Sequence, residues 1–187
     1  MAKKLGFLVD SDRCVGCHSC EMACKNEYQQ EPSIRWRKVY PLREDAFGSA
    51  AREFASMACN HCEDPACLTA CPVIAYTKRE DGIVIHDPQR CIGCRMCMLA
   101  CPYKVPQFNE KVKKVEKCHM CAARQDRGEK PACVAGCPME AISVIDLNNN
   151  NFSKVSRTLP GFPDIGITKP TTRFIKPIVG VQVRREK

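Results

Sequence analysis

Sixteen cysteines stand in this 187-residue chain in four groups of four, with spacing typical of iron–sulfur cluster ligands. The first and third groups have the spacing C-x2-C-x2-C-x3-C, the second has C-x2-C-x4-C-x3-C, and the fourth has C-x2-C-x11-C-x3-C. Proline follows the last cysteine of the second, third and fourth groups. In chain order the groups are Cys14, Cys17, Cys20 and Cys24; Cys59, Cys62, Cys67 and Cys71; Cys91, Cys94, Cys97 and Cys101; and Cys118, Cys121, Cys133 and Cys137.

The short gaps explain why cluster chemistry is expected of these thiols. In a ferredoxin-type run, three cysteines hold corners of one cubane, and the fourth, followed by proline, serves a second cluster. Proline has no backbone N–H and fixes its own φ, so the chain turns away after the fourth ligand. Sixteen thiolates at these spacings predict four 4Fe-4S clusters, a set that conducts electrons.

Two other uses of cysteine compete with this hypothesis. A disulfide scaffold is typical of short secreted chains, but the apolar run after the basic N-terminus stops at Asp10, so no secretory signal is expected. Zinc also binds C-x2-C pairs, usually two pairs separated by about a dozen residues or more. A third cysteine after two residues and a fourth before proline have no role in such a site. A zinc-binding interaction protein is therefore the weaker alternative.

The charge balance changes once clusters are bound. The formal net charge is +8 with the cysteines counted as neutral. Sixteen thiolates together with four oxidised cores of about +2 each add about −8, which brings the chain near neutrality. A nucleic-acid partner is therefore not expected. No stretch approaches the roughly eighteen apolar residues that span a bilayer, so any membrane anchor must be another subunit.

The groups and the short patterned stretches around them predict an α+β fold of two ferredoxin-like, pseudo-repeated modules with two 4Fe-4S clusters each. The second and third groups build a middle module, and the first and fourth build an outer one. The predicted divisions are 1–27 plus 111–146 for the outer module, 28–52 for a connecting insertion, 53–110 for the middle module and 147–187 for an extended C-terminal arm. The alternative for the last segment, which is rich in proline, is a disordered tail.

Within the modules the strands and helices are expected to be short. Strands are predicted at 6–9, 53–58, 83–85 and 141–145, and helices at 21–25, 64–68 and 96–100. Trp36 marks either a partner-facing patch or a strand that covers a cluster. A run of lysines approaches the fourth group, either as the solvated face of a hairpin or as cations that raise a cluster's reduction potential. These lysines are Lys111, Lys113, Lys114 and Lys117.

The other side chains suggest no catalytic site. No cysteine is missing from any group, so histidine ligation of a cluster is not expected. The four histidines are His18, His61, His86 and His119. There is also no Walker loop, no dinucleotide-binding glycine pattern and no Ser–His–Asp arrangement. The chain is therefore expected to move electrons and to transform no substrate itself.

Several motifs, spread over nearly the whole chain, together resemble the four-cluster iron–sulfur subunit of the dimethyl sulfoxide reductase, or complex iron–sulfur molybdoenzyme, family. The motifs are Asp12–Cys17 (DRCVGC), Cys59–Cys67 (CNHCEDPAC), Arg79–Val84 (REDGIV), Cys91–Cys97 (CIGCRMC), Cys133–Pro138 (CVAGCP) and Lys169–Pro177 (KPTTRFIKP). The third group keeps all its cysteines, although some family members replace one, so 4Fe-4S clusters are expected throughout.

The resemblance implies how the ligands are shared among four clusters. Each cluster takes three cysteines from one group and one from another, in agreement with the general rule for the fourth cysteine. The four implied sets are Cys14, Cys17, Cys20 and Cys137; Cys118, Cys121, Cys133 and Cys24; Cys59, Cys62, Cys67 and Cys101; and Cys91, Cys94, Cys97 and Cys71.

The resemblance also implies partners and a location. They are a molybdopterin catalytic subunit, holding a bis-pyranopterin Mo or W centre, and a quinone-reactive membrane anchor. Many such complexes are exported folded by a signal on the catalytic subunit, so an extracytoplasmic, membrane-associated position is preferred to the cytoplasmic side. The alternative is a polyferredoxin-type subunit of another redox complex, such as a hydrogenase or reductive dehalogenase.

Overall fold

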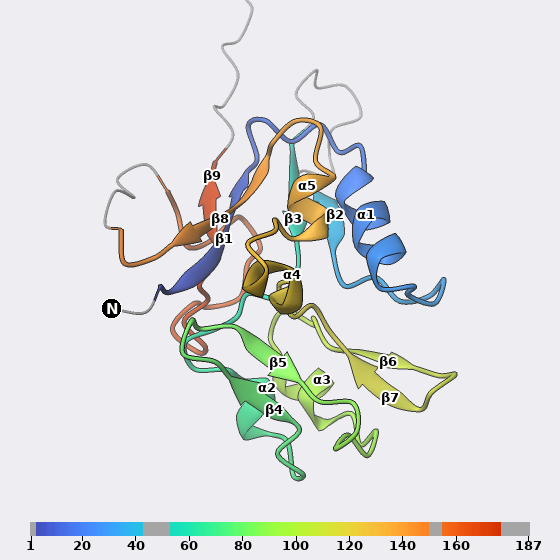
Figure 1. Ribbon diagram of the computed structural model, residues 1–187. Coiled ribbons are helices and arrows are strands. Elements are labelled where there is room, and N and C mark those ends of the chain that lie inside the picture. Colours follow the sequence, from blue (N-terminus) through green and yellow to red (C-terminus); the bar gives the residue numbers. More distant parts are fainter. Residues whose placement is uncertain (1–2, 43–52, 150–154, 177–187) are drawn as a thin grey trace, which may run out of the picture.

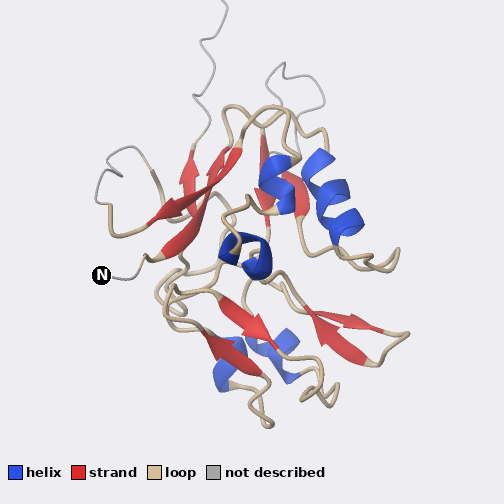
Figure 2. Ribbon diagram, viewed as in Figure 1, coloured by secondary structure: helices blue, strands red, loops and turns tan. Residues whose placement is uncertain are grey.

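The computed structural model describes residues 3–42, 53–149 and 155–176, and shows short strands and helices arranged in two halves (Figures 1 and 2). The strands are β1 (Leu5–Asp10), β2 (Lys38–Pro41), β3 (Phe54–Met57), β4 (Tyr76–Lys78), β5 (Val84–His86), β6 (Gln107–Asn109), β7 (Lys114–Glu116), β8 (Ile142–Asp146) and β9 (Arg173–Ile175). The helices are α1 (Ser19–Glu27), α2 (Ala66–Thr69), α3 (Met96–Ala100), α4 (Ala122–Asp126) and α5 (Ala132–Ala135). Helices this short are not stable alone in water, so they depend on what they pack against.

The upper half of Figure 1 is built on a three-stranded sheet with the order β8-β1-β9. Phe7 and Val9 point to the same face of β1 and enter the core, as expected of a half-buried strand. The antiparallel β1–β8 pairing joins residues 5–9 to residues 142–146, and helix α1 packs on α5. A Cβ on Gly136 would lie 2.6 Å from the Cβ of Ala23, so glycine permits this close helix contact.

The lower half contains two hairpins and a helix pair. Strands β4 and β5 pair antiparallel, as do β6 and β7, and helix α2 packs on α3. The hydrophobic core of the lower half contains Tyr76, Val84 and Val115 together with the thiols of Cys67 and Cys97. Cysteine sulfurs thus take up part of the space that larger apolar side chains fill in other small cores.

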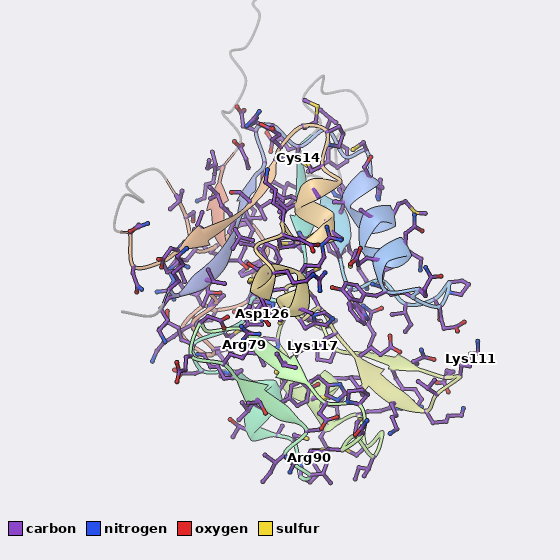
Figure 3. The ribbon with its side chains drawn as sticks, viewed as in Figure 1. Cys14, Arg79, Arg90, Lys111, Lys117 and Asp126 are labelled. Carbon is purple, nitrogen blue, oxygen red and sulfur yellow. The ribbon has the colours of Figure 1, made fainter. Side chains whose placement is uncertain are left out.

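The two halves meet around Ile83 and Met120, both fully buried, with Phe7 beside them in the same hydrophobic cluster. An ion pair also joins the two halves. Arg79, just after β4, contacts Asp126 on α4 through two hydrogen bonds of 2.6 and 2.9 Å (Figure 3). The fourth cysteine group, which starts directly after β7, is therefore linked to both halves.

The C-terminal segment 155–176 is the main described part of the predicted extended arm. It is largely extended, but it packs on its own chain, because β9 pairs in parallel with β1 and Phe174 is 0% exposed. Thr171 strengthens this contact by donating its backbone N–H and its hydroxyl to the carbonyl of Asn60. Residues 177–187 of the predicted arm lie outside the described residues, as do 43–52 of the predicted insertion.

Candidate metal centres

All sixteen predicted ligands lie in the described residues, and none of them forms a disulfide. The third cysteine of each group stands on a short helix, namely Cys20 on α1, Cys67 on α2, Cys97 on α3 and Cys133 on α5. Eight thiols are buried and six are partly buried. The two exposed thiols, Cys17 and Cys94, belong to opposite halves of the molecule.

Two cavities are each lined by three cysteines of one group and the last cysteine of another. The lining thiols are Cys14, Cys17, Cys20 and Cys137 in the upper half, and Cys59, Cys62, Cys67 and Cys101 in the lower half. These are two of the four sets that the family resemblance implies. In each cavity four thiols converge from two short helices and their adjoining loops, an arrangement suited to a compact inorganic core.

Cys24 on α1 interacts with cysteines of the fourth group. Burial and then the negative charge of Cys118 raise the pKa of Cys24, and Cys133 adds to the effect. The pKa of Cys121 is likewise raised by burial first and also by Cys118 and Cys133. Cys24 therefore shares its electrostatic environment with the first three cysteines of the fourth group.

The remaining thiols lie at the far end of the lower half. Burial raises the pKa of Cys97, and the charges of Cys91 and Cys94 add to it. Cys71 and Cys91 both pack against the hydrophobic cluster that contains Cys97. Cys71, Cys91, Cys94 and Cys97 thus lie in or near one apolar cluster.

The backbone repeats one conformation in every group, at the residue just before the second cysteine. This residue has a positive φ, with values of 70° for Gly16, 42° for His61, 73° for Gly93 and 55° for Met120. The turn directs its N–H at the sulfur of the first cysteine. The N–S distances are 3.5 Å for His61–Cys59, 3.4 Å for Gly93–Cys91 and 3.3 Å for Met120–Cys118. Such bonds favour a thiolate over a thiol.

A second repeated contact follows three of the groups. The residues three places after the last cysteine, Ile74, Lys104 and Glu140, also have positive φ. The next N–H then reaches back to the sulfur in two cases, at 3.3 Å for Ala75–Cys71 and 3.3 Å for Ala141–Cys137. The first group, which lacks the proline, uses a side chain instead, because Gln30 Nε2 lies 3.2 Å from Cys24 Sγ.

Burial makes ligation by these thiols dependent on pH. Burial raises the pKa of Cys62 to about 11 and that of Cys67 to about 12, so both hold their protons at neutral pH without metal. Metal ligands must be deprotonated, so cluster insertion releases protons. The converging thiols and the N–H groups directed at their sulfurs fit a 4Fe-4S cluster.

His61 and His119 contact groups other than the cysteine sulfurs. Val84 N–H donates to His61 Nδ1 at 3.0 Å, inside the core. His119 meets the ring edges or faces of Tyr28 and Trp36, with centroid separations of 4.7 and 5.3 Å. Trp36 is partly buried next to the fourth group, in the bend just before β2, and also lines an open pocket, so both of its predicted roles stay predictions.

The lysines near the fourth group differ in exposure, and an effect of any of them on a cluster's reduction potential stays a prediction. Lys111 and Lys113 lie at the exposed tip of the β6–β7 hairpin, where they pair with Glu31 and Glu110 (Figure 3). The hairpin with a solvated face is confirmed for these two. Lys117 is buried instead, lines the cavity of Cys59 and its partners, and donates to the carbonyl oxygens of Val84 and Cys118.

Sequence reasoning missed three polar residues beside the upper thiols. Ser56 Oγ lies 3.2 Å from Cys20 Sγ, Gln30 contacts Cys24, and Arg37 is buried next to Ser56. They come from the segment leading into β2 and from β3, far from most of the thiols in sequence. The β2–β3 pairing brings Arg37 and Ser56 together, whereas Gln30 reaches back to Cys24 from the loop after α1.

Comparison with known proteins agrees with this geometry. Residues 50–147 match the model of the 4Fe-4S dicluster domain, and residues 5–26 match that of a 4Fe-4S binding domain. The chain is 41% identical to the B chain of the anaerobic dimethyl sulfoxide reductase of Escherichia coli (strain K12), covering 95% of this chain and 90% of that protein. It is 43% identical to the probable anaerobic dimethyl sulfoxide reductase chain YnfG of the same strain, with the same coverage.

A more distant relative extends the comparison beyond dimethyl sulfoxide reductases. The B subunit of the tetrathionate reductase of Salmonella typhimurium (strain LT2) is 34% identical over 89% of this chain and 68% of its own length. Cysteine geometry, both domain models and the relatives agree on the cofactor class. The chain belongs to the family of iron–sulfur B subunits of anaerobic dimethyl sulfoxide reductases, and it binds 4Fe-4S clusters.

Proposed function

We propose that this chain is an electron-transfer subunit that carries electrons through four 4Fe-4S clusters. Its sixteen thiols are the proposed ligands, in the four interleaved sets that the resemblance implies. The observation that carries the proposal is the pair of cavities, because each is lined by three thiols of one group and one of another. The clusters supply one-electron steps, and the chain supplies thiolates, N–H donors and shielding from water.

The sets form a line in this proposal. Burial and then the charge of Cys59 raise the pKa of Cys118, so the two inner sets are neighbours across the junction between the halves. The two outermost sets contain the exposed thiols Cys17 and Cys94. Cys14 and Arg90, the residue before Cys91, lie at opposite ends of the molecule in Figure 3. Electrons would enter at one exposed end and leave at the other.

Apolar side chains surround both exposed ends. Val15, Met22 and Met139 are exposed near the upper end, and Ile74, Ile92, Met96 and Leu99 near the lower end. Exposed apolar patches rimmed by polar residues mark protein contacts. We call these two sets of exposed apolar side chains the upper and lower rims. We assign them to two redox partners, a molybdopterin catalytic subunit with Mo or W and a quinone-reactive membrane subunit.

Location follows from these partners. Among the described residues no helix is both long and apolar enough to cross a bilayer. In the proposal the chain is a peripheral subunit of a membrane-bound complex, on the extracytoplasmic side, where the catalytic subunit would be exported with it. Protease protection in sealed spheroplasts and inverted vesicles would distinguish this side from the cytoplasmic one.

The ligand sets are tested by Cys24→Ser in the purified complex. The change should alter the low-temperature EPR signal of the cluster held by Cys118, Cys121 and Cys133, since Cys24 completes that set. Cys71→Ser is the matched control and should alter a signal of the other half. Alteration of the cluster held by Cys14, Cys17 and Cys20 in the Cys24→Ser protein would contradict the pairing.

Metal analysis and gentle anaerobic isolation separate the alternatives. The proposal predicts about sixteen irons and sixteen acid-labile sulfides per chain, whereas about four zincs without sulfide would indicate a zinc-binding protein. Co-purification of a pterin-bearing subunit is expected. A hydrogenase or dehalogenase subunit in its place would indicate the polyferredoxin alternative.

A further inference from the structure

Arg37 is a buried cation of the upper half, only 1% exposed, directly before β2. Its guanidinium carbon lies 4.5 Å from the centroid of the Phe7 ring. Its Nη1 donates to both the carbonyl and the hydroxyl oxygen of Ser56, each at 3.1 Å. In the described part of the chain, Nε and Nη2 have no hydrogen-bond partner. A buried guanidinium with unpaired N–H groups is costly unless negative charge lies close to it.

The charges that stabilise the protonated form of Arg37 most are thiolates. Burial alone would lower the pKa of Arg37, but the charges of four cysteines raise it overall. In order of effect these are Cys133, Cys118, Cys20 and Cys24. Three of them belong to the proposed set of the fourth group, and Cys20 belongs to the set of the first group. Thiolates of both upper sets therefore act on the guanidinium.

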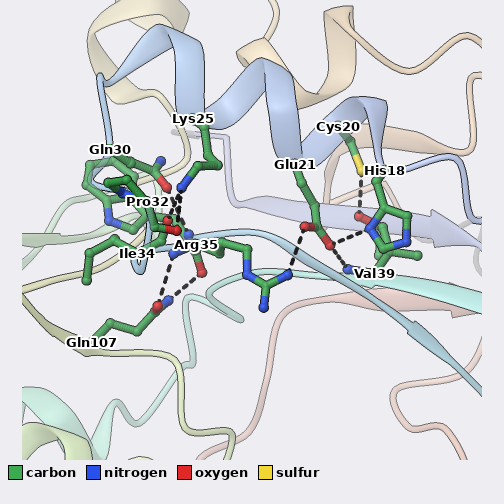
Figure 4. Close-up of polar contacts among 12 residues, drawn as sticks. His18, Cys20, Glu21, Lys25, Gln30, Pro32, Ile34, Arg35, Val39 and Gln107 are labelled. Atoms are coloured by element: carbon green, nitrogen blue, oxygen red, sulfur yellow. Dashed lines mark hydrogen bonds and ion pairs between the residues drawn. The ribbon is translucent and has the colours of Figure 1, made fainter.

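Ser56 connects Arg37 to one of these sets through hydrogen bonds. Because Nη1 donates to Ser56 Oγ, the hydroxyl proton of Ser56 is free for the sulfur of Cys20, 3.2 Å away. Figure 4 draws the contact of the Cys20 sulfur as a dashed line and shows Arg35 directed instead toward Glu21. Arg35 is about half exposed and its contact with Glu21 measures 3.7 Å, so the two arginines differ in environment although they are two residues apart.

We propose that Arg37 raises the reduction potentials of the two upper clusters, directly for the set of Cys24, Cys118, Cys121 and Cys133 and through Ser56 for the set of Cys20. The inference rests on the ligand sets of the proposed function. Uptake of one electron adds one unit of negative charge to a set. A fixed positive charge in a low-dielectric interior favours that more negative state. Guanidinium stays protonated throughout, so the effect does not depend on its titration.

The test is Arg37→Gln in the full complex, followed by anaerobic potentiometric titration with EPR detection. Iron and sulfide are measured first, and the signals are assigned with the Cys24→Ser and Cys71→Ser proteins. The midpoint potentials of the two upper clusters should fall, whereas those of the lower half should stay unchanged. Arg35→Gln is the matched control and should leave all four unchanged. A fully loaded Arg37→Gln complex with unaltered upper midpoints would overturn the proposal.

Two further variants keep the test decisive if Arg37→Gln loses iron. Arg37→Lys retains the charge and should load fully, with upper midpoints closer to the unmodified protein than any neutral variant. Ser56→Ala should lower the midpoint of the Cys20 cluster alone. Iron loss in Arg37→Lys as complete as in Arg37→Gln would show that the guanidinium acts by packing, against the proposal. A deficit of clusters in the unmodified complex would instead contradict the ligand sets.

Discussion

At the scale of single residues, the left-handed turn before the second cysteine is what directs N–H groups at sulfur. Glycine adopts this conformation without strain, whereas other residues accept it at a cost of roughly 1–2 kcal/mol. Two groups use Gly16 and Gly93 here, and two use His61 and Met120. The difference lies in the space beside the turn. A Cβ on Gly93 would lie 2.4 Å from the carbonyl oxygen of Lys113.

Gly93→Ala should therefore lose the cluster held by Cys91 and its partners. The expected iron content falls from about sixteen to about twelve per chain, because the new methyl group forces the turn away from its sulfur. Iron and sulfide analysis of the purified complex measures this. Gly128→Ala is the control, since Gly128 has a similar φ of 78° but no atom within 4 Å of the added Cβ. Equal iron loss in both variants would mean that backbone strain, and not the clash, removes the cluster.

Residue types and spacing predict the ligands but not the groups around them. Cysteine spacing is local, and so a short stretch of sequence is enough to recognise it. Arg37 and Ser56 reach the thiols only through the pairing of β2 with β3, where Lys38 is opposite Met57. The buried cation closest to the upper sets was therefore not foreseen, and the lysines near the fourth group were considered instead.

At the scale of elements, the predicted strands and helices next to cysteines are present with shifted ends. The helix at 96–100 agrees with α3, and the strand at 6–9 is extended by one residue at each end in β1. The sequence analysis did not predict α4, a five-residue helix inside the long gap of the fourth group, because propensity alone does not stabilise so short a helix. It also missed β9, whose register depends on a partner strand about one hundred and sixty-five residues earlier.

Burial of β9 leads to a stability prediction for the C-terminal segment. Phe174→Ala should destabilise the loaded chain by about 3–5 kcal/mol, the usual cost of removing a buried phenylalanine. Phe174 packs edge-on against Phe162, at a centroid separation of 5.5 Å, and pairs with Val9 in the sheet. The measurement is the apparent unfolding temperature of the anaerobic protein together with its resistance to protease.

The control for this prediction lies in the same segment. Ile167 is 61% exposed, so Ile167→Ala should change the stability by no more than about 0.5 kcal/mol. Equal unfolding temperatures for the Phe174→Ala and unmodified chains would show that 155–176 does not pack on β1 in solution.

At the scale of the whole molecule, the proposed line of thiol sets ends in two apolar rims on opposite halves. The spacing of the cysteines predicts that this chain conducts electrons, but it does not order the four sets. The order depends on which thiols meet at the junction, and only the folded arrangement brings Cys59 near Cys118. The formal charge of +8 likewise acquires its meaning from the buried thiolates, which bring the loaded chain close to neutral.

The rims give a prediction about assembly with partners. Leu99 on α3 is 82% exposed, and Leu99→Glu should release the partner at the lower end while the iron content is retained. Loss of an apolar anchor and burial of a charge weaken association by roughly tenfold or more. Affinity isolation through a tag on this chain, with quantification of the bound subunits, measures the effect.

The matching variant at the upper end is Met22→Glu, which should release the other partner. Ile167→Glu, on an exposed site far from both rims in sequence, should release neither. Loss of the same subunit in both rim variants would contradict two separate docking ends.

The pairing of β1 with β8 and β9 also sets the order in which the chain can mature during synthesis. The hairpins of the lower half can pair once residues 53–116 have left the ribosome, because they join strands that are close in sequence, whereas Lys117 and Thr168 complete its cavity later. The three-stranded sheet of the upper half cannot close until residues 142–175 have emerged, since both partner strands of β1 lie in this late part of the chain. The first group of cysteines is translated first and enclosed last, so Cys14 to Cys24 are the thiols that stay longest exposed to oxygen in the nascent chain.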